Sequence, residues 1–158
     1  MHAVVGLGAN LGDRLAALRA ALEGLARVAT VEKVSSVYAT APVGGPPQPD
    51  YLNAAVLVET ELRPRELLHA LLAIESTLGR VRRERNGPRV IDLDVLWIEG
   101  VVVKSEELEV PHPRLAERAF ALVPMLEVAP GARDPRTGVA YVAPEGEVRI
   151  VPEMSLLR

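Results

Sequence analysis

A chain of 158 residues has the usual length of one domain, and with 49% apolar residues it can bury a core. The absence of cysteine excludes disulfides, thiolate catalysis and cysteine-ligated zinc, and the net charge of −3 argues against a dedicated DNA-binding protein. No apolar run reaches the roughly 18 residues of a membrane span, and no signal peptide is visible, so we expect one cytoplasmic domain over 1–158.

The N-terminal segment predicts a strand followed by a helix. Residues 3–9 (AVVGLGA) have the apolar character of a short strand, and Asp13 can cap a helix that follows. Apolar residues at helical spacing indicate that helix: Leu15, Leu18, Ala21, Leu22 and Leu25. We interpret GLGANLG, residues 6–12, as a tight strand-to-helix turn, because it misses the third glycine of G-x-G-x-x-G; anion binding is the less favoured alternative.

Two alternating segments follow, and they predict a pair of strands in a long hairpin-like unit. They are residues 28–40 and 51–62. The segment between them, 41–50, holds four prolines and two glycines and is typical of a loop.

The remaining chain adds a helix, a strand and a C-terminal extension. A helix is expected from Pro64 to about Leu78, and after a basic loop the residues 90–98 predict a buried strand. Residues 112–130 predict one or two helices, and the tail from 131 has short strand-like pieces.

The order strand, helix, strand, strand, helix, strand is the split βαβ pattern. We therefore expect an α+β fold with a ferredoxin-like βαββαβ core, an antiparallel sheet with two helices on one face, and added C-terminal helices and strands. The other face is expected to be covered by loops and the C-terminal third, or left open as a binding platform.

The most apolar run of the chain contains two carboxylates. In GPRVIDLDVLWI, residues 87–98, Asp92 and Asp94 share one side of the strand, with stems about 6–7 Å apart. At an effective dielectric of about 20, two such charges repel by roughly 2–3 kcal/mol. A divalent cation would offset that repulsion, and hard carboxylate oxygens suit Mg²⁺. The alternative is a half-exposed strand with two solvated aspartates.

Five arginines precede this strand within ten residues: Arg80, Arg82, Arg83, Arg85 and Arg89. Alone, such a run is typical of a flexible basic loop. Beside metal-binding carboxylates it favours polyphosphate chemistry, because Mg²⁺ bridges phosphate oxygens and guanidinium groups neutralise charge in the transition state. The motif G-x-x-x-x-G-K-[ST] is absent, so arginines and metal are expected to hold any ATP phosphates.

The segment R-N-G-P-R-V-I-D-L-D-V-L, residues 85–96, closely resembles the signature of the 6-hydroxymethyl-7,8-dihydropterin pyrophosphokinases of folate biosynthesis. Further segments agree with that family in order and spacing: GLGANLGDR, VSSVYATAPVG, QPDYLNAAV, IESTLGRVR and VPHPRLAERAFALVPMLEVAP. The resemblance covers nearly the whole chain to about Pro130. It implies a ferredoxin-like fold and transfer of pyrophosphate from ATP to the hydroxymethyl group of the reduced pterin, with release of AMP.

The resemblance also implies site residues. It makes Asp92 and Asp94 the ligands of two Mg²⁺ ions, and it makes Arg80 and Arg89 the catalytic arginines that grip the triphosphate of ATP. The implied ATP-binding residues are Glu75, Arg82, His112 and Arg118. The implied pterin-binding residues are Thr40, Val43, Tyr51, Asn53 and Phe120.

Some of these residues also have plainer interpretations. The amide of Asn53 offers a donor and an acceptor to the edge of a pterin ring, whereas alone it is more typical of a satisfied strand residue. Phe120, the only phenylalanine, is alone more typical of a core, and it matches the aromatic that stacks on the pterin with Tyr51 opposite. Trp97 is assigned to the core.

The chain departs from the family pattern at four positions near the nucleotide. Asn86 stands where many members have tryptophan, and Pro113 replaces an aromatic found in some. Glu107 and Glu109 lie where some members have an arginine and a threonine beside ATP. These changes bear on nucleotide affinity and leave the chemistry intact.

Two rival functions remain open at this stage. A ferredoxin-like RNA-binding module would use the basic loop, but it expects aromatics in a K/R-G-F-G-F-type motif, which the chain lacks. A catalytically silent small-molecule sensor would have no use for Asp92 and Asp94 together. The favoured prediction is a monomeric enzyme with ATP and the pterin as its only partners, and neither a nucleic acid nor a membrane.

Overall fold

The computed structural model describes residues 1–41, 47, 49–79, 90–146 and 148–157. Its helices are α1 (Arg14–Ala26), α2 (Pro64–Thr77) and α3 (Ala119–Val128), with a 3-10 turn at Leu115–Glu117. Its strands are β1 (His2–Ala9), β2 (Thr30–Val34), β3 (Tyr38–Thr40), β4 (Tyr51–Glu59), β5 (Asp92–Ile98), β6 (Val103–Lys104), β7 (Glu109–Val110) and β8 (Arg149–Ile150). No helix of the described residues is both long and apolar enough to cross a membrane.

The main sheet is antiparallel and has the strand order β5-β1-β4-β3-β8, with β2 also paired to β4. The first two helices connect β1 to β2 and β4 to β5, so the expected ferredoxin-like α+β core is confirmed. The caps expected from the sequence are also present. Asp13 accepts a hydrogen bond from the Ala16 N–H at the start of α1, and Pro64 is the first residue of α2.

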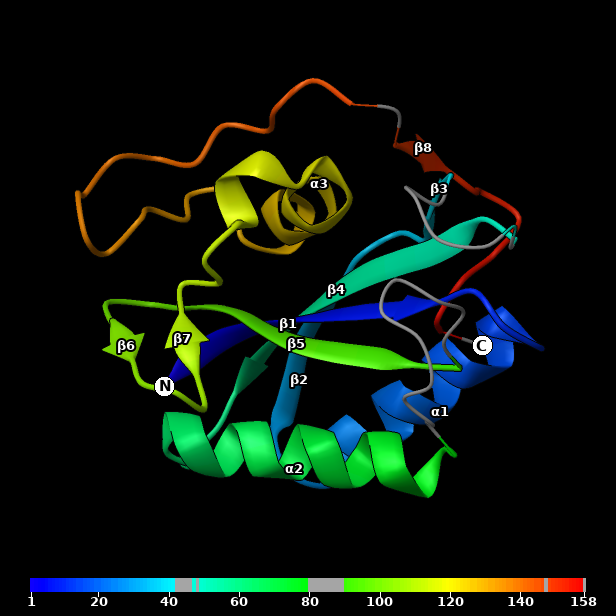
Figure 1. Cartoon of the computed structure of the whole chain (residues 1–158), viewed down its shortest axis with the longest axis horizontal. Helices are drawn as coiled ribbons and strands as arrows, with labels where there is room; N and C mark the ends of the chain where they lie inside the picture. The colour runs from blue at the N-terminus through cyan, green and yellow to red at the C-terminus, as the bar shows by residue number, and fades with distance from the viewer. Residues whose placement is uncertain (42–46, 48, 80–89, 147, 158) are drawn as a thin grey trace.

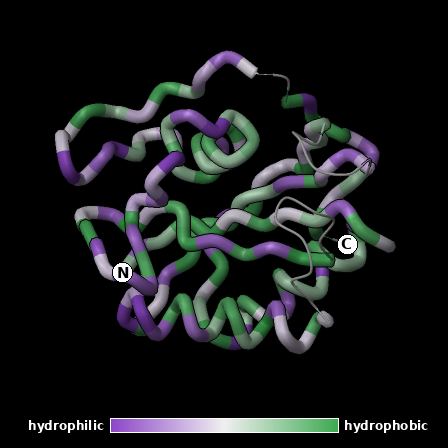
Figure 2. Tube along the Cα trace, in the orientation of Figure 1, coloured by the Kyte–Doolittle hydropathy of each residue, from purple (hydrophilic) through white to green (hydrophobic). Residues whose placement is uncertain are grey.

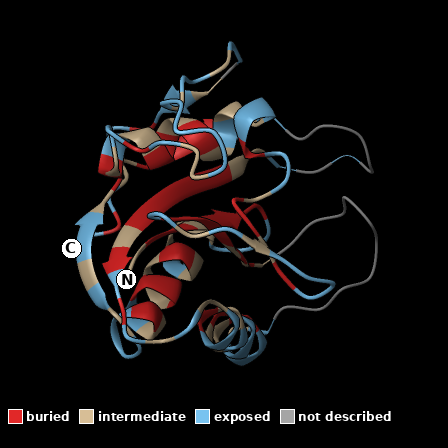
Figure 3. Ribbon diagram, turned by 90° about the vertical axis from the view of Figure 1, so that its left-hand side faces the viewer, coloured by how far each residue is buried: buried red, intermediate tan, exposed pale blue. Residues whose placement is uncertain are grey.

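Helices cover the two faces of the sheet unequally. The leucines of α1 and α2 pack on one face, in a core shared with alternate residues of β1 such as Val5 and Leu7. Helix α3 covers part of the other face through Leu122 and Met125, in a second core with Val4 and Ala55 (Figure 1). Figure 3 shows the buried strands between these helix layers. Among the described residues, α3 therefore covers only part of this face.

Helix α2 shows how patterning fixes this arrangement. Hydrophobic and hydrophilic residues alternate along it in Figure 2. Its buried side chains are Leu67, Leu71 and Glu75, which recur every four residues and therefore share one face of the helix. Glu75 is the polar member of that buried face.

The sequence misplaces several strand boundaries. The segment 28–40, expected as one strand, divides into β2 and β3 at Ser35, whose hydroxyl accepts the Ala55 N–H at 2.8 Å. The Ser35 side chain, rather than a backbone carbonyl, accepts this hydrogen bond, so the regular backbone ladder is interrupted at this residue. Strand β5 begins at Asp92 rather than at residue 90, and the small sheet of β6 and β7 was not expected.

The interpretation of GLGANLG as a turn is wrong for its first half. Gly6 and Gly8 lie inside β1, and only Gly12, with φ of 67°, lies in the turn before α1. A left-handed conformation favours glycine at the last position, whereas the two strand glycines need another explanation.

Candidate active site

The two aspartates lie on the sheet face that carries α3. Asp92 pairs with Gly8 of β1 and Asp94 pairs with Gly6, and Gly6 pairs in turn with Ala55 of the α3-side core. Residues that pair directly across strands share a face, so both carboxylates project from this side. Both residues are half-buried, and neither faces the closed core beneath the sheet. Hard oxygen donors in an accessible position fit Mg²⁺.

The outer edge of β5 is held by a buried carboxylate. Glu75, only 3% exposed, projects from α2 and accepts the backbone N–H of Leu93 at 2.7 Å. Leu93 separates the two aspartates in the chain, so this hydrogen bond fixes the strand at the point where both project. Glu75 was expected from the family resemblance to bind ATP; in the structure this contact ties it to β5.

A row of four directly paired residues crosses the sheet beside the aspartates: Asp92, Gly8, Asn53 and Tyr38. Neighbouring strands lie about 4.8 Å apart, so the backbones at Asp92 and Asn53 are separated by about 10 Å. Gly8 stands between them without a side chain. A Cβ built on Gly8 would lie 3.1 Å from Oδ1 of Asn53, which is why the position suits glycine. This row, called the trough below, has the Asp92 carboxylate and the Asn53 amide on either side of Gly8, which has no side chain and is itself buried.

The amide of Asn53 is oriented by a neighbour. Asn53 is 7% exposed, and its Nδ2 donates to Oγ1 of Thr40 at 3.1 Å. Thr40 pairs with Tyr51, two residues before Asn53 on β4, so all three side chains project from the α3 side of the sheet. The structure therefore brings together three of the five residues expected at a pterin, and one of them, Asn53, lies in the paired row that begins at Asp92.

Phe120 and Arg118 lie at the start of α3 and contact each other. The guanidinium carbon of Arg118 is 5.6 Å from the centre of the Phe120 ring, a cation–π distance. Phe120 is 38% exposed, so the expected stacking residue is not part of the core. Its exposure leaves ring surface available for contact with a flat heterocycle.

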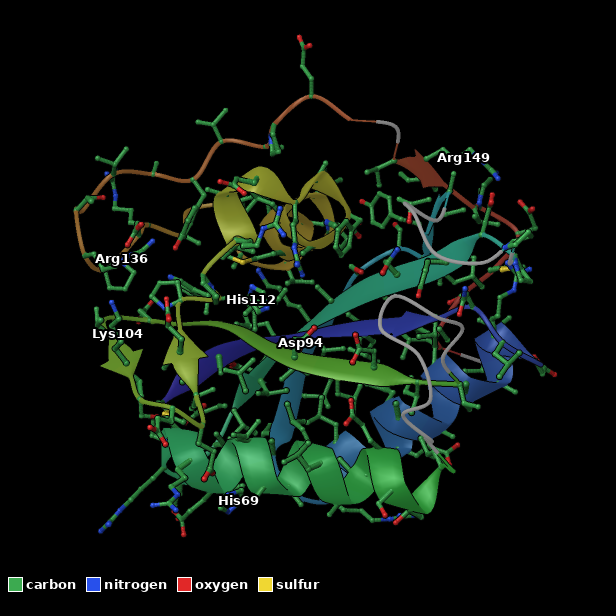
Figure 4. All side chains as sticks on the ribbon, viewed as in Figure 1. His69, Asp94, Lys104, His112, Arg136 and Arg149 are labelled. Carbon is green, nitrogen blue, oxygen red and sulfur yellow. The ribbon has the colours of Figure 1, made fainter. Side chains whose placement is uncertain are left out.

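His112 is held between β5 and α3. Its backbone N–H donates to the Leu96 carbonyl at 2.9 Å, and Figure 4 shows it on the same side of β5 as α3. Burial and the charge of Arg118 lower the pKa of His112 below its usual 6.5, although the charges of Asp92 and Glu109 oppose that shift. The imidazole is therefore favoured in its neutral form, and it lies within electrostatic reach of one aspartate and of Arg118.

One contact of this region was missed by the sequence analysis. Glu127, near the end of α3, accepts hydrogen bonds from the Ser36 N–H at 2.8 Å, from the Ser36 hydroxyl and from the Tyr38 hydroxyl. It thus joins α3 to the strand that carries Thr40. The signal available in the sequence was a lone glutamate in the apolar helix AFALVPMLEV, where a charge needs a partner.

Four expected site residues lie outside the residues that the structure describes: Val43, Arg80, Arg82 and Arg89. The basic loop and most of the proline-rich loop are therefore not part of the geometry above.

The assignment of Trp97 to the core is confirmed, since it is 5% exposed and its indole N–H donates to the Arg133 carbonyl at 2.9 Å.

Among the described residues, a pocket that is open to solvent lies away from the aspartates. It has a volume of about 540 Å³, and His2, Trp97 and Arg133 are among its lining residues. Asp92, Asp94 and Asn53, which the sequence predicts to take part in the chemistry, do not line this pocket.

Comparison with known proteins identifies relatives over most of the chain. Residues 4–130 match the family 7,8-dihydro-6-hydroxymethylpterin-pyrophosphokinase (HPPK). A 2-amino-4-hydroxy-6-hydroxymethyldihydropteridine pyrophosphokinase of Methylorubrum extorquens is 47% identical over 155 residues, covering 94% of this chain and 98% of the relative. A protein of the same name from Bacillus subtilis is 48% identical over 128 residues, covering 80% and 77%.

Solved structures agree with the fold. A Plasmodium falciparum HPPK-DHPS, solved with pterin and p-hydroxybenzoate, matches 89% of this chain with a TM-score of 0.69 at 15% identity. The chain spans only 40% of that longer protein, and at this identity the likeness concerns the fold alone. The match over residues 4–130 and the curated relatives show that the chain belongs to the 7,8-dihydro-6-hydroxymethylpterin-pyrophosphokinase family.

Proposed function

We propose that this chain catalyses its family's reaction with two Mg²⁺ ions held by Asp92 and Asp94. The reaction is the transfer of pyrophosphate from ATP to 6-hydroxymethyl-7,8-dihydropterin in folate synthesis. The observation that supports the metal site is the projection of two half-buried carboxylates from one face of the sheet, opposite Gly8 and Gly6. That donor set and its accessibility are suited to Mg²⁺ that also binds phosphate oxygens.

The trough divides the two substrates between its ends. The Asn53 amide, oriented by Thr40, would bind the polar edge of the pterin, with Phe120 and Tyr51 against its faces. The phosphates of ATP would lie at the aspartate end. Because no side chain stands at Gly8 between the two ends, the hydroxymethyl group would extend from one end toward the phosphates at the other.

The chemical step is an in-line attack of the pterin hydroxymethyl oxygen on the β-phosphorus of ATP. The new bond joins that oxygen to the β-phosphorus, and the bond from the β-phosphorus to the oxygen of AMP breaks. Bound Mg²⁺ would neutralise phosphate charge and lower the pKa of the attacking hydroxyl. No side chain is assigned as a general base.

The arginines of the sequence complete the proposal. Arg80 and Arg89 would neutralise charge on the triphosphate during transfer, with Arg82, Arg118 and His112 on the nucleotide side and Val43 on the pterin side. The favoured neutral form of His112 makes it a hydrogen-bonding partner rather than a cation for the phosphates. We also propose that residues 1–158 act as one monomeric, cytoplasmic pyrophosphokinase domain.

The nucleotide product tests the proposed reaction. The protein is incubated with ATP, Mg²⁺ and reduced hydroxymethylpterin, and the nucleotides are separated by chromatography. Pterin-dependent AMP without ADP is expected. ADP would indicate an ordinary kinase, and binding of ATP without turnover would favour the silent sensor domain.

Single substitutions test the metal site within the same assay. Asp92→Asn and Asp94→Asn should each lower AMP formation at least 100-fold, because each removes an anionic oxygen ligand at nearly constant volume. The matched control is Asp134→Asn, which removes a carboxylate paired with Arg136 on the surface. Equal rates in Asp92→Asn and the control would contradict the assignment.

A further inference from the structure

A second group of metal-ligating side chains lies at the far end of the sheet from the aspartates. His2 Nε2 is 3.0 Å from a carboxylate oxygen of Glu32 and 3.8 Å from one of Glu59. One ligand atom from each of the three residues lies within 4.8 Å of the others. Among the described residues this is the one such group of three.

Three neighbouring strands build this group. His2 of β1 pairs with Glu59 of β4, and Glu59 pairs with Thr30 of β2, so the side chains of His2 and Glu59 project from the same face. The register of β2 shifts between Val31 and Lys33, which makes Glu32 an extra residue at a bulge. Bulges redirect side chains, and here the carboxylate of Glu32 reaches His2 across β4.

The separations match those of ligands around one ion. Nitrogen and oxygen ligands lie about 2.0–2.2 Å from Zn²⁺, so two corners of a tetrahedral site are about 3.4 Å apart. The two separations from His2 Nε2, 3.0 and 3.8 Å, bracket that distance, and the carboxylate oxygens of Glu32 and Glu59 lie within 4.8 Å of each other. Two carboxylates and a neutral imidazole carry two negative charges, which one divalent ion would neutralise. All three side chains are partly exposed, so an ion can enter from solvent.

A contrasting histidine on the same protein lacks this arrangement. Nε2 of His69, on α2, also contacts a carboxylate, that of Glu107. The second group near that carboxylate is the guanidinium of Arg65, at 3.4 Å. A cation already neutralises Glu107, whereas His2 faces two carboxylates. Both clusters contain a surface histidine. The cluster at His2 has two carboxylates, whereas the cluster at His69 has one carboxylate and a guanidinium.

We propose that His2, Glu32 and Glu59 form a binding site for a divalent transition-metal ion, with Zn²⁺ as the best match. Three protein ligands with one nitrogen leave a fourth position for water. Imidazole favours Zn²⁺ over Mg²⁺, so this site and the aspartate pair select different ions. The two sites are separated along β1 by the four residue steps from His2 to Gly6, or about 13 Å.

Zn²⁺ titration of the full chain tests the proposal. The protein carries Asp92→Asn and Asp94→Asn, which remove the other carboxylate pair, and it has no polyhistidine tag. Isothermal titration with Zn²⁺ is expected to show one equivalent. Co²⁺ substituted for Zn²⁺ should give the visible absorbance of a low-symmetry nitrogen and oxygen site. Adding His2→Gln or Glu59→Gln should weaken Zn²⁺ binding at least about tenfold.

The matched control is His69→Gln in the same background, which removes the contrasting histidine and should leave Zn²⁺ affinity unchanged. Circular dichroism and thermal unfolding without metal establish that each variant is folded. Absence of the Zn²⁺ equivalent in the folded parent would overturn the proposal. So would equal affinity in the parent and His2→Gln, since the ion would then lie elsewhere and the cluster would be an ion pair only.

Discussion

At Gly8 a single absent side chain shapes the candidate site. The residue sits in the middle of the row that joins Asp92 to Asn53, and a Cβ there would come within 3.1 Å of Asn53 Oδ1. That approach is closer than an ordinary van der Waals contact, so the Asn53 amide would have to shift. Since Asn53 is the residue proposed to bind the pterin edge, the effect of such a shift belongs to substrate binding.

Gly8→Ala is therefore expected to raise the KM for the pterin about tenfold, because a displacement of a few tenths of an ångström misaligns the amide. The KM for ATP should change less, and the free energy of unfolding should change by about 1 kcal/mol or less. Steady-state kinetics with each substrate varied in turn measure this difference. Gly131→Ala is the control, since nothing lies within 4 Å of its added Cβ. An unchanged pterin KM in Gly8→Ala would argue against binding at Asn53.

Tyr38 shows how a buried hydroxyl links two elements. Burial and the hydrogen bond to Glu127 raise its pKa from 10.0 to about 12. The folded state therefore favours the protonated phenol, because a phenolate would be both desolvated and next to a carboxylate.

This raised pKa predicts a loss of stability at alkaline pH. The Tyr38 contribution is fully present below pH 10, and it falls as the pH rises from 10 toward 12, since only the unfolded state releases the proton easily there. Urea unfolding from pH 8 to 11 should show a shallower decline in Tyr38→Phe than in the parent. Absorbance at 295 nm gives a second check. Tyr141, whose pKa burial also raises to about 12, should still ionise late in the variant.

At the scale of elements, α2 and β5 act as a unit. The buried carboxylate of Glu75 accepts the Leu93 N–H from the strand edge, so the helix determines the position of the segment that carries both aspartates. A sequence pattern gives no direct sign of this contact. The pattern places Glu75 on the apolar side of a helix. That placement is expected for a nucleotide-binding residue and for a structural residue alike, so it does not distinguish them.

Substitutions at Glu75 separate those two roles. Glu75→Leu leaves the Leu93 N–H without its acceptor and should lower the free energy of unfolding by about 2–3 kcal/mol. Glu75→Gln keeps an oxygen acceptor, so most of that stability should return. If Glu75 acts by positioning β5, Mg²⁺ affinity should change in parallel with the free energy of unfolding in the two variants. Glu75→Gln should then be close to the parent in both measurements. Loss of ATP binding in a stable Glu75→Gln protein would instead favour a direct nucleotide contact.

The sequence predicts the elements of this fold well where periodicity is strong. Leucines at helical spacing located α1 and α2, and the apolar run around Asp92 and Asp94 located β5. The single strand expected over 28–40 failed for a local reason, because Ser35 interrupts the ladder with its own hydroxyl. Alternation alone cannot reveal that a side chain replaces a backbone acceptor.

Part of the site could be predicted only through the family resemblance. Thr40, Asn53 and Asp92 are far apart in the chain, and strand register brings them together; register depends on tertiary pairing. The glycines of β1 were visible in the sequence, but their role as a trough floor depends on which residues lie opposite. The link from Glu127 to Tyr38 joins residues 89 positions apart and has no local signal.

At the scale of the whole molecule, the two faces of the sheet differ in how far helices cover them. One face is closed by α1 and α2 over a continuous apolar core, and the other is only partly covered by α3 (Figure 3). The closed face holds the larger of the two apolar cores, so the protein can carry two carboxylates on the other face and remain folded. Ligands that bind the trough should therefore stabilise an already folded protein rather than induce its folding.

Thermal unfolding measures that stabilisation. A ligand at about 100 times its dissociation constant adds roughly 2.7 kcal/mol. For a chain of this size that corresponds to a rise in Tm of about 5–10 °C. ATP with Mg²⁺ should give this rise, and ATP with EDTA should give much less. The Asp92→Asn, Asp94→Asn double variant should lose most of the Mg²⁺-dependent part, and an undiminished rise would place the metal elsewhere.

Strand β5 lies at the edge of the sheet, where open hydrogen-bonding groups would invite a strand from another molecule. Here two of those groups are already used: Glu75 accepts the Leu93 N–H, and the His112 N–H donates to the Leu96 carbonyl. The same contacts that hold the aspartates in place thus shield an apolar edge from self-association. A change that loosens β5 would therefore have two effects at once. It would displace the two carboxylates, and it would expose a strand edge that can pair with another molecule and aggregate.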